Sequence, residues 1–283
     1  MKKIISVILA LLMLSLALVS CGPDAADTNA DDADNADVVD NADDKGANEE
    51  ELEDLIIGIT YFEPMNYFDE NGKLVGFETE FATEVCKKLG YNPVFQEIDW
   101  GSKEIELNSK AIDCIWNGMT ITEERKANMS ISNPYMKNEQ VIITKKDVAA
   151  NFTTAGSLKD MIVVAEAGSA GEELVNGDAF FAGADYTAVD TMAKAIMEVA
   201  AGTADACVVD YITALGMIGA GTDYENLAKV EGIEFAKEEY GIAFRKDSEL
   251  TEKVNEVIAE LYNDGTIQRI AEWYSLETQV IAQ

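Results

Sequence analysis

Histidine is absent from this chain of 283 residues. Its absence excludes imidazole catalysis, histidine-ligated metals, and nucleophilic schemes that pair serine or cysteine with histidine. Basic residues are also scarce: 21 lysines and arginines stand against 53 acidic residues, which gives a formal net charge of -32. Because phosphate groups repel such a chain, we expect no nucleic-acid partner and no adsorption to an anionic membrane surface.

Cysteine is a third scarce residue type, with four in the whole chain. No CxxC pair occurs, so a zinc or iron–sulfur centre has little support, and we expect no metal and no cofactor. Cys86, Cys114 and Cys207 lie in apolar stretches, where we expect them to be small core residues. Three such cysteines cannot all pair, which argues against a disulfide framework.

One long apolar run is present, from Ile4 to Val19, behind a basic start. It is short for a membrane-spanning helix, and small residues follow it, so residues 1–20 are interpreted as a secretory signal. Residues 18–21 resemble the lipobox of a bacterial lipoprotein signal. This resemblance implies cleavage before Cys21 and lipidation of its thiol, with fatty acyl groups such as palmitate on the mature protein. The alternative is an ordinary cleaved signal with a chance cysteine.

An acidic segment follows the signal. Residues 22–54 hold fourteen acidic residues and a single lysine, and no aromatic side chain. Such a segment cannot bury enough apolar area to offset its ordering entropy, so residues 21–54 are predicted to be a disordered acidic tether that starts with the lipidated Cys21. A calcium-binding aspartate repeat is the alternative, although the acidic residues are irregularly spaced.

From Leu55 onward, apolar runs of strand length alternate with segments of helical periodicity. Phe77, Phe81, Val85 and Leu89 fall on one face of a helix that Gly90 would end. This β–α alternation predicts the α/β class, with mainly parallel sheets covered by helices. Strands are predicted at 55–59, 93–98, 112–116, 141–144, 161–165, 206–209 and 241–244, and further helices at 105–110, 192–200, 250–262 and 266–274, with another helix beginning at Ser169.

The segment from Gly118 to Arg125 combines a helix start with a misplaced cation. Thr122 is a good N-cap, and Glu123 and Glu124 suit the first helical turn, but Arg125 does not. An arginine beside free backbone N–H groups suggests a site for a carboxylate. The alternative is a surface arginine that pairs with one of the two glutamates.

In parallel α/β sheets, ligands bind beyond the carboxyl ends of the strands. The residues at those ends combine two aromatics, one arginine, one carboxylate and two helix starts, which suits a free amino acid in its zwitterionic form. They are Phe62, Trp100 and the segment from Gly118 to Arg125 in the first half, and the segment from Gly168 to Ala170 and Asp210 in the second half.

The order and spacing of motifs over residues 55–275 resemble the extracellular solute-binding proteins of family 3, the amino-acid receptors of ABC importers. The resemblance implies a two-lobed periplasmic-binding-protein fold of type II, in which two crossover strands join two α/β lobes. Lobe one would be 55–143 plus 241–283, lobe two would be 144–240, and closure would bury a ligand in the cleft. The matching stretches are 62–64, 72–78, 112–114, 118–125, 164–171, 203–206, Asp210 and 241–244.

By this resemblance, Arg125 would bind the ligand's α-carboxylate, helped by Thr120 and the backbone of Gly118. Asp210 would accept hydrogen bonds from the α-ammonium group. A strand-end cap for the following helix is the alternative role for Asp210.

The resemblance also implies that Phe62 and Trp100 sandwich the ligand side chain, with core packing as the alternative. Ser169 and Ala170 would offer backbone N–H groups from lobe two, although Ala170 stands where many relatives carry a hydroxyl. Tyr61 lies near the position where binders of basic amino acids carry an acidic residue, which argues against a simple lysine or arginine ligand.

Glu166 lies where a residue that contacts the ligand side chain often sits. A carboxylate there favours a cationic or amide tail over an acidic one. The alternative is a solvated loop glutamate.

The function implied is that of an extracytoplasmic substrate-binding lipoprotein of an ABC importer, with a free, polar L-amino acid as ligand. We expect the protein to be a monomer, and we do not expect it to be an enzyme. The lipid on Cys21 would hold it at the outer face of the cell membrane or on the periplasmic side, and the permease subunits would be its partners. Two alternatives remain: a ligand-binding sensor lipoprotein without a transport role, and a cyclic-acid dehydratase on the same fold that uses Glu63 or Glu166 as a general acid.

Overall fold

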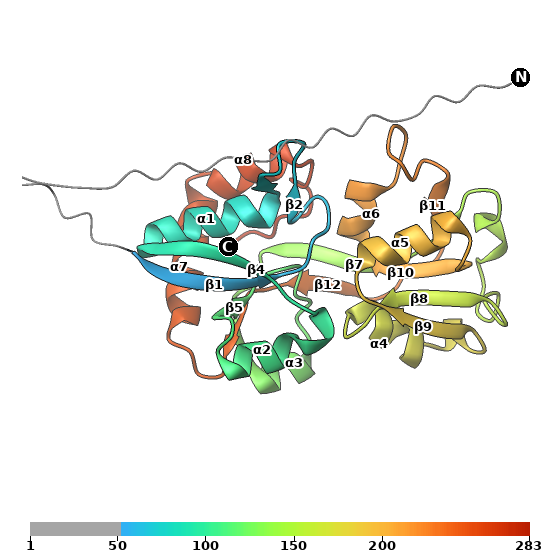
Figure 1. Cartoon of the computed structure of the whole chain (residues 1–283), viewed down its shortest axis with the longest axis horizontal. Helices are drawn as coiled ribbons and strands as arrows, with labels where there is room; N and C mark the ends of the chain where they lie inside the picture. The colour runs from blue at the N-terminus through green and yellow to red at the C-terminus, as the bar shows by residue number, and fades with distance from the viewer. Residues whose placement is uncertain (1–51) are drawn as a thin grey trace, which may run out of the picture. The chain divides into compact units, whose positions relative to one another are not determined.

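The computed structural model describes residues 52–283, which fold as two α/β lobes (Figure 1). The sheet of the first lobe has the strand order β4-β1-β5-β13-β6. β1 pairs in parallel with β4 and β5, while β13 runs antiparallel to β5 and β6. Its strands are β1 (Glu53–Ile59), β4 (Tyr91–Glu97), β5 (Cys114–Ile115), β6 (Met129–Ile131) and β13 (Ala243–Arg245), and a hairpin of β2 (Tyr67–Phe68) and β3 (Leu74–Val75) stands apart.

The sheet of the second lobe has the strand order β11-β7-β10-β8-β9, and β12 also pairs with β7. β8, β9 and β10 are parallel, whereas β7 runs antiparallel to β10, β11 and β12. The strands are β7 (Met136–Lys145), β8 (Ile162–Glu166), β9 (Asp185–Val189), β10 (Ala206–Asp210), β11 (Leu227–Lys229) and β12 (Lys237–Tyr240).

Helices cover both faces of each sheet (Figure 1). On the first sheet, α1 (Phe77–Leu89), α7 (Leu250–Asn263) and α8 (Thr266–Trp273) enclose the largest apolar cluster, and α2 (Lys103–Ser109) and α3 (Glu123–Asn128) lie on the opposite face. On the second sheet, α5 (Met192–Ala201) and α6 (Tyr211–Met217) cover one face, and α4 (Ala170–Gly177) covers the other. Short 3-10 turns span Trp100–Ser102, Ala149–Asn151 and Ala179–Phe181.

Helix α1 has the bounds that its periodicity predicts. Phe77, Phe81 and Val85 are fully buried against the first sheet, because a spacing of four residues keeps them on one face. The helix ends at Gly90, whose left-handed backbone lets its N–H donate to the carbonyl of Cys86. Cys86, Cys114 and Cys207 are buried and unpaired, which confirms that they are core residues.

Strands β7 and β12 connect the lobes, which confirms the predicted two-lobed fold with two crossover strands. β7 pairs with β12 through Met136 to Glu139 and with β10 from Gln140 onward. The predicted lobe boundary at 143/144 therefore falls inside a strand that already belongs to the second sheet. The boundaries themselves stay predictions.

The start of the body differs from the prediction. β1 begins at Glu53 rather than Leu55, because Glu53 and Asp54 continue the parallel ladder opposite Tyr91 and Asn92. The predicted signal, Cys21 and the tether up to residue 51 lie outside the described residues. Within residues 52–283, no helix has the length and apolar character needed to cross a membrane.

The sheets also contain more antiparallel pairing than predicted. The chain enters the second lobe through β7 and comes back to the first lobe through β12 and β13. Strands β7 and β13 therefore run opposite to the neighbouring strands of the βα units. Helix α6 was anticipated only as the helix that Asp210 would cap in its alternative role. The strands that were not predicted are each short or mostly exposed, namely β2, β3, β6, β9, β11 and β12. The third predicted strand, 112–116, shortens to Cys114–Ile115.

We expect Gly76→Ala to destabilise the fold strongly. Gly76 begins α1 with φ of 126°, and an added Cβ would lie 2.1 Å from the carbonyl oxygen of Met65. Strain and overpacking together should lower the unfolding free energy by about 3 kcal/mol or more. The matched control is Gly90→Ala at the other end of α1, where φ is 77° and no heavy atom lies within 4 Å, so that about 1 kcal/mol is expected. Equal losses in urea unfolding would contradict this reading.

Candidate functional site

Arg125 lies in the first turn of α3, as its sequence position predicts. The Thr122 hydroxyl accepts a hydrogen bond from the Arg125 backbone N–H at 3.2 Å and so caps the helix. The Arg125 side chain is not on the surface, because only 4% of the residue is exposed. It makes no ion pair with Glu123 or Glu124, so the alternative of a surface pair is wrong.

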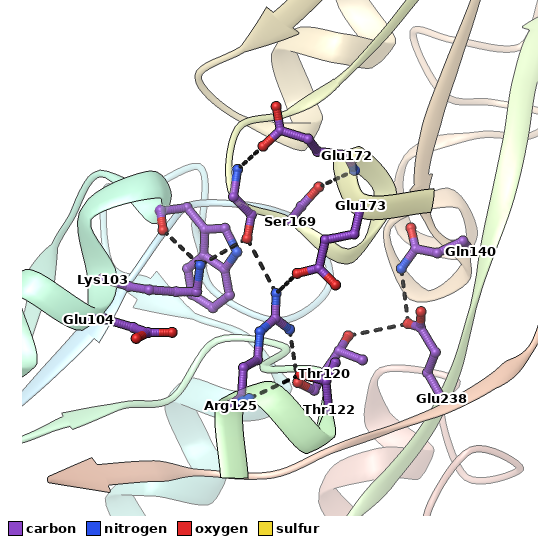
Figure 2. A network of polar contacts seen from close by, with 12 residues as sticks. Lys103, Glu104, Thr120, Thr122, Arg125, Gln140, Ser169, Glu172, Glu173 and Glu238 are labelled. Atoms are coloured by element: carbon purple, nitrogen blue, oxygen red, sulfur yellow. Dashed lines mark hydrogen bonds and ion pairs between the residues drawn. The ribbon is translucent and has the colours of Figure 1, made fainter. Parts of the chain in front are cut away.

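The Arg125 guanidinium instead reaches the second lobe (Figure 2). Its Nη1 donates to the carbonyl of Thr120 at 2.8 Å, within its own lobe. Its Nη2 donates to the carbonyl of Gly168 at 3.3 Å and to the Glu173 carboxylate at 3.1 Å, both in the second lobe. A buried cation of lobe one therefore holds a carboxylate of lobe two.

Lys103 of α2 meets the same carbonyl. Its Nζ donates to Gly168 at 2.8 Å and to the Trp100 carbonyl at 3.1 Å, and lies 4.9 Å from the centre of the Trp100 ring. Burial, followed by the nearby Arg125 charge, lowers the pKa of Lys103 to about 8. Trp100 itself is buried in the cluster between the first sheet and α2, with the lysine against its ring.

The lobes touch closely at two places. A Cβ on Gly168 would lie 3.0 Å from the Cα of Gly101. On α6, a Cβ on Gly216 would lie 2.5 Å from the carbonyl oxygen of Glu63 and 2.6 Å from Pro64. Glycine at these positions lets the two backbones approach, so this is a conformation in which the lobes are closed on each other.

Asp210 ends β10 and occupies the N-cap position of α6, but its side chain makes no capping hydrogen bond. Its Oδ1 accepts instead from the side-chain amides of Asn138, at 2.8 Å, and Gln140. The same two amides donate to Glu238 at 3.0 and 2.9 Å, and the Thr120 hydroxyl adds a third bond to Glu238 at 3.2 Å. Burial raises the pKa of both carboxyls, and Glu238 raises that of Asp210 further. Two acidic side chains therefore lie side by side, and a cation placed between them would stabilise the ionised form of both.

Glu166 is the last residue of β8, and only 2% of it is exposed. This burial excludes the alternative of a solvated loop glutamate. Its Oε1 has no hydrogen-bond partner among the described residues. Burial, and then the charge of Asp210, raise the pKa of Glu166 to about 8, while Lys103 acts in the opposite direction.

The backbone N–H of Gly118 is engaged by the protein itself. It donates to both carboxylate oxygens of Glu78, at 2.9 and 3.1 Å, and the Tyr135 hydroxyl donates to the same group. Burial raises the pKa of Glu78 to about 7. This N–H is therefore not free to bind a ligand. The absence of a side chain at Gly118 instead makes room for the Phe62 ring, since a Cβ there would lie 3.3 Å from it.

Ser169 and Ala170 begin α4, facing the first lobe near Arg125. The Ser169 hydroxyl accepts from the Glu172 N–H at 3.1 Å, and the Ser169 N–H donates to the Glu166 carbonyl at 3.2 Å. The Glu172 carboxylate accepts from the N–H of Gly168 at 2.6 Å. Ser169 and Glu172 thus form a capping box whose return bond goes to the N–H of Gly168, one residue before the N-cap.

Phe62 belongs to the main core of the first lobe and also lines a cavity of about 760 Å³. The cavity lies between the loop that follows β1 and the segment from Gly216 to Tyr224 of the second lobe. Residues 52–283 contain no group of three or more acidic or cysteine side chains arranged to hold a metal ion.

Sequence reasoning missed six polar residues of this region. A usable signal existed for two of them, because Asn138 and Gln140 are two residues apart and so share one face of a strand. No local pattern marks the others. The six are Glu78, Lys103, Asn138, Gln140, Glu173 and Glu238.

We expect the described fold to lose stability as the pH rises from about 5 to 8. The pKa of Glu166 is raised from 4.5 to about 8, so its protonated form is favoured in the folded state, and its contribution is full below pH 4.5 and lost as the pH passes through 8. Glu166→Gln has the shape of the protonated glutamate but cannot ionise. Between pH 5 and pH 8 it should therefore lose less unfolding free energy than the wild type, by an amount of the order of 3 kcal/mol. Melting temperatures at pH 5 and pH 8 measure it.

The control for this pH effect is Glu123→Gln, because the Glu123 side chain is 92% exposed. This variant should keep the wild-type slope. Identical slopes for the Glu166 and Glu123 variants would show that general charge repulsion, not the buried carboxyl, sets the pH profile.

We expect Gly216→Ala to hold the lobes apart. The added methyl group would overlap the Glu63 backbone, which cannot move as freely as the end of a side chain. Small-angle X-ray scattering should show a larger radius of gyration than for the control Gly177→Ala, whose Cβ would meet no heavy atom within 4 Å. Equal radii for the two variants would mean that the contact does not limit closure.

Comparisons with known proteins agree with this geometry. Residues 55–277 match the family described as bacterial extracellular solute-binding proteins, family 3. The L-cystine-binding protein TcyJ of Escherichia coli (strain K12) is 33% identical over 226 residues, which cover 79% of this chain and 83% of that protein. The arginine-binding extracellular protein ArtP of Bacillus subtilis (strain 168) is 32% identical over 231 residues, which cover 79% of this chain and 87% of that protein.

Among solved structures, an ancestral arginine-binding protein bound to arginine is 37% identical, with a TM-score of 0.71. The match covers 78% of this chain and 97% of that chain. The chain therefore belongs to the bacterial extracellular solute-binding proteins of family 3.

Proposed function

We propose that this chain is the extracytoplasmic substrate-binding lipoprotein of an ABC importer and that it binds a free, polar L-amino acid between its two lobes. The observation that carries the proposal is the Arg125 guanidinium, which is buried on lobe one and holds a carboxylate of lobe two. A ligand's α-carboxylate can take the place of the Glu173 carboxylate on Arg125. Glu173 is 54% exposed at its side chain and can return to water.

Binding and closure are one process in this proposal. Arg125 and Thr120 hold the α-carboxylate from lobe one, and the start of α4, at Ser169 and Ala170, approaches it from lobe two. Asp210 accepts from the α-ammonium group. Because such a ligand interacts with both lobes at once, it favours the closed conformation by its differential affinity for the two states.

Phe62 and Trp100 contribute the apolar part of the site. The Phe62 ring borders the cavity between the lobes, and Gly118 leaves room for it. The Trp100 ring is held in place by packing, because Lys103 lies against it, and it would provide a fixed apolar surface. Glu166, at the end of β8 in the second lobe, is near enough to Lys103 for the lysine charge to act on it.

Amino-acid binding is supported by the relatives, since TcyJ and ArtP are named as binding proteins for cystine and arginine, and the proposal extends this binding to a role in an importer. The lipid on Cys21 would hold the chain at the outer face of the membrane, and the acidic segment would separate the folded body from the bilayer. The permease subunits would receive the closed form of a monomer. No cofactor is required for any of these steps.

We expect Arg125→Ala to weaken binding of the preferred amino acid at least about tenfold, since a charge-assisted hydrogen bond contributes roughly 1.5–3 kcal/mol. A thermal-shift screen of the twenty amino acids, ornithine and cystine identifies that ligand, and calorimetry measures its affinity. Lys126→Ala on the same helix, where the side chain is half exposed, is the control and should bind as the wild type does. Unchanged affinity in a folded Arg125→Ala variant would refute the assignment.

A dehydratase on the same fold is the second candidate, and the buried Glu166 favours it. A carboxyl whose pKa is raised to about 8 can donate a proton near neutral pH. Incubation with cyclic acids, followed by mass spectrometry of the products, tests this candidate. Turnover that is lost in Glu166→Gln would support it over simple binding.

A further inference from the structure

We infer that the preferred ligand carries a second positive charge on its side chain and that the Glu166 carboxylate receives this charge between the lobes. The inference rests on the proposed function and narrows it from a polar amino acid to a cationic one. It concerns the part of the ligand beyond the α-carboxylate and the α-ammonium group.

The first step is the condition of Glu166 itself. The residue is 2% exposed, and its Oε1 has no hydrogen-bond partner among residues 52–283. A buried carboxylate without a partner loses its hydration and gains nothing in exchange. A cation placed beside Glu166 would remove this cost, whereas an apolar or acidic tail would leave it or increase it.

The second step is that the protein's own cation does not neutralise Glu166. Lys103 acts on it through space, but the Nζ of Lys103 is bound to two carbonyl oxygens, those of Trp100 and Gly168. The other charges that act on Glu166 are Asp210 and Asp99, both negative. The local balance around Glu166 is therefore negative.

The third step is a count of charges across the site. The α-carboxylate of a ligand would replace Glu173 on Arg125, which leaves that balance unchanged. The α-ammonium would meet the pair of Asp210 and Glu238, which share two amide donors. Both charged groups of an amino acid with a neutral side chain are then engaged by Arg125 and by the pair of Asp210 and Glu238. Glu166 still has no counter-charge.

The position of Glu166 fits a tail rather than the backbone of an amino acid. It ends β8, while Asp210 ends the neighbouring strand β10, so the two carboxyls leave the same edge of the second sheet. A ligand held at Arg125 and Asp210 would therefore extend its side chain beside Glu166. Asp99 of the first lobe also acts on Glu166, so a cationic tail placed there would meet negative charge from both lobes.

The test compares arginine with citrulline, which has nearly the same shape but a neutral urea group in place of the guanidinium. Calorimetry on the full chain at pH 8 should give at least about tenfold tighter binding of arginine. In Glu166→Gln, arginine should weaken at least about tenfold and citrulline should change by less than about threefold. The Glu123→Gln control should keep the wild-type preference.

A second readout follows the proton. At pH 7 the raised pKa leaves Glu166 largely protonated, so a cationic tail should expel a proton when it binds. Calorimetry in two buffers of different ionisation enthalpy should show release with arginine and less release with citrulline. Contributions from Asp210 and Glu238 cancel in this comparison, because both ligands carry the same α-ammonium. The difference should disappear in Glu166→Gln.

The outcomes separate this inference from the proposed function. Equal affinity for citrulline and arginine, or a preference for cystine or a neutral amino acid that Glu166→Gln does not change, would overturn the inference while amino-acid binding stands. If none of the amino acids in the screen binds, both the inference and the proposed function fail. Arginine, lysine or ornithine at the head of the screen, with loss of preference in Glu166→Gln, would support it.

Discussion

The carbonyl oxygen of Gly168 is the contact between the two lobes on which two buried cations converge. It accepts hydrogen bonds from two cations of the first lobe, Lys103 and Arg125. The turn that carries it continues into the N-cap of α4, so its position is set by Ser169 and by the Glu172 carboxylate on its own N–H (Figure 2). Since both cations are buried, this carbonyl provides a dipole that water would otherwise provide.

This arrangement explains why the closed lobes tolerate so many acids. Glu78, Glu166 and Asp210 are buried, and Glu238 lies beside Asp210. Each has a raised pKa, for which burial is the first cause. Under the proposed function, a positively charged ligand favours ionisation of the acids that it contacts. Closure, protonation and ligand charge are then parts of one equilibrium.

The sequence predicted the elements that carry a continuous apolar face. Helices α1, α7 and α8 pack against one cluster, so their periodicity is complete and their bounds were close to those observed. Strand β9 was missed because its side chains are mostly exposed and show no alternation that marks a sheet. Local pattern thus identifies elements that pack strongly, and it fails for those that only complete a sheet.

The same limit applies to the candidate site. Arg125 was found because a cation in a first helical turn is locally unfavourable, and this conflict is visible in the sequence. Glu238 carries no such signal, since the residues around it resemble a polar edge strand. Only the pairing of β12 with β7, which sets Glu238 opposite Asn138, brings it to Asp210. Residues whose role depends on a long-range strand register cannot be predicted from local pattern.

Glu173 gives the closed state a carboxylate of its own. Its Oε1 lies 3.1 Å from Arg125, in the position that a ligand's α-carboxylate would take under the proposed function. Because the Glu173 side chain is half exposed and Arg125 is not, the exchange costs little for the glutamate, while the arginine keeps a partner throughout. The net gain from the ligand's α-carboxylate at Arg125 is then only the difference between its interaction free energy with the guanidinium and that of the Glu173 carboxylate. Under the proposed function, selectivity beyond the α-carboxylate depends on the other acids of the site, Glu166, Asp210 and Glu238, which interact with the cationic groups of the ligand.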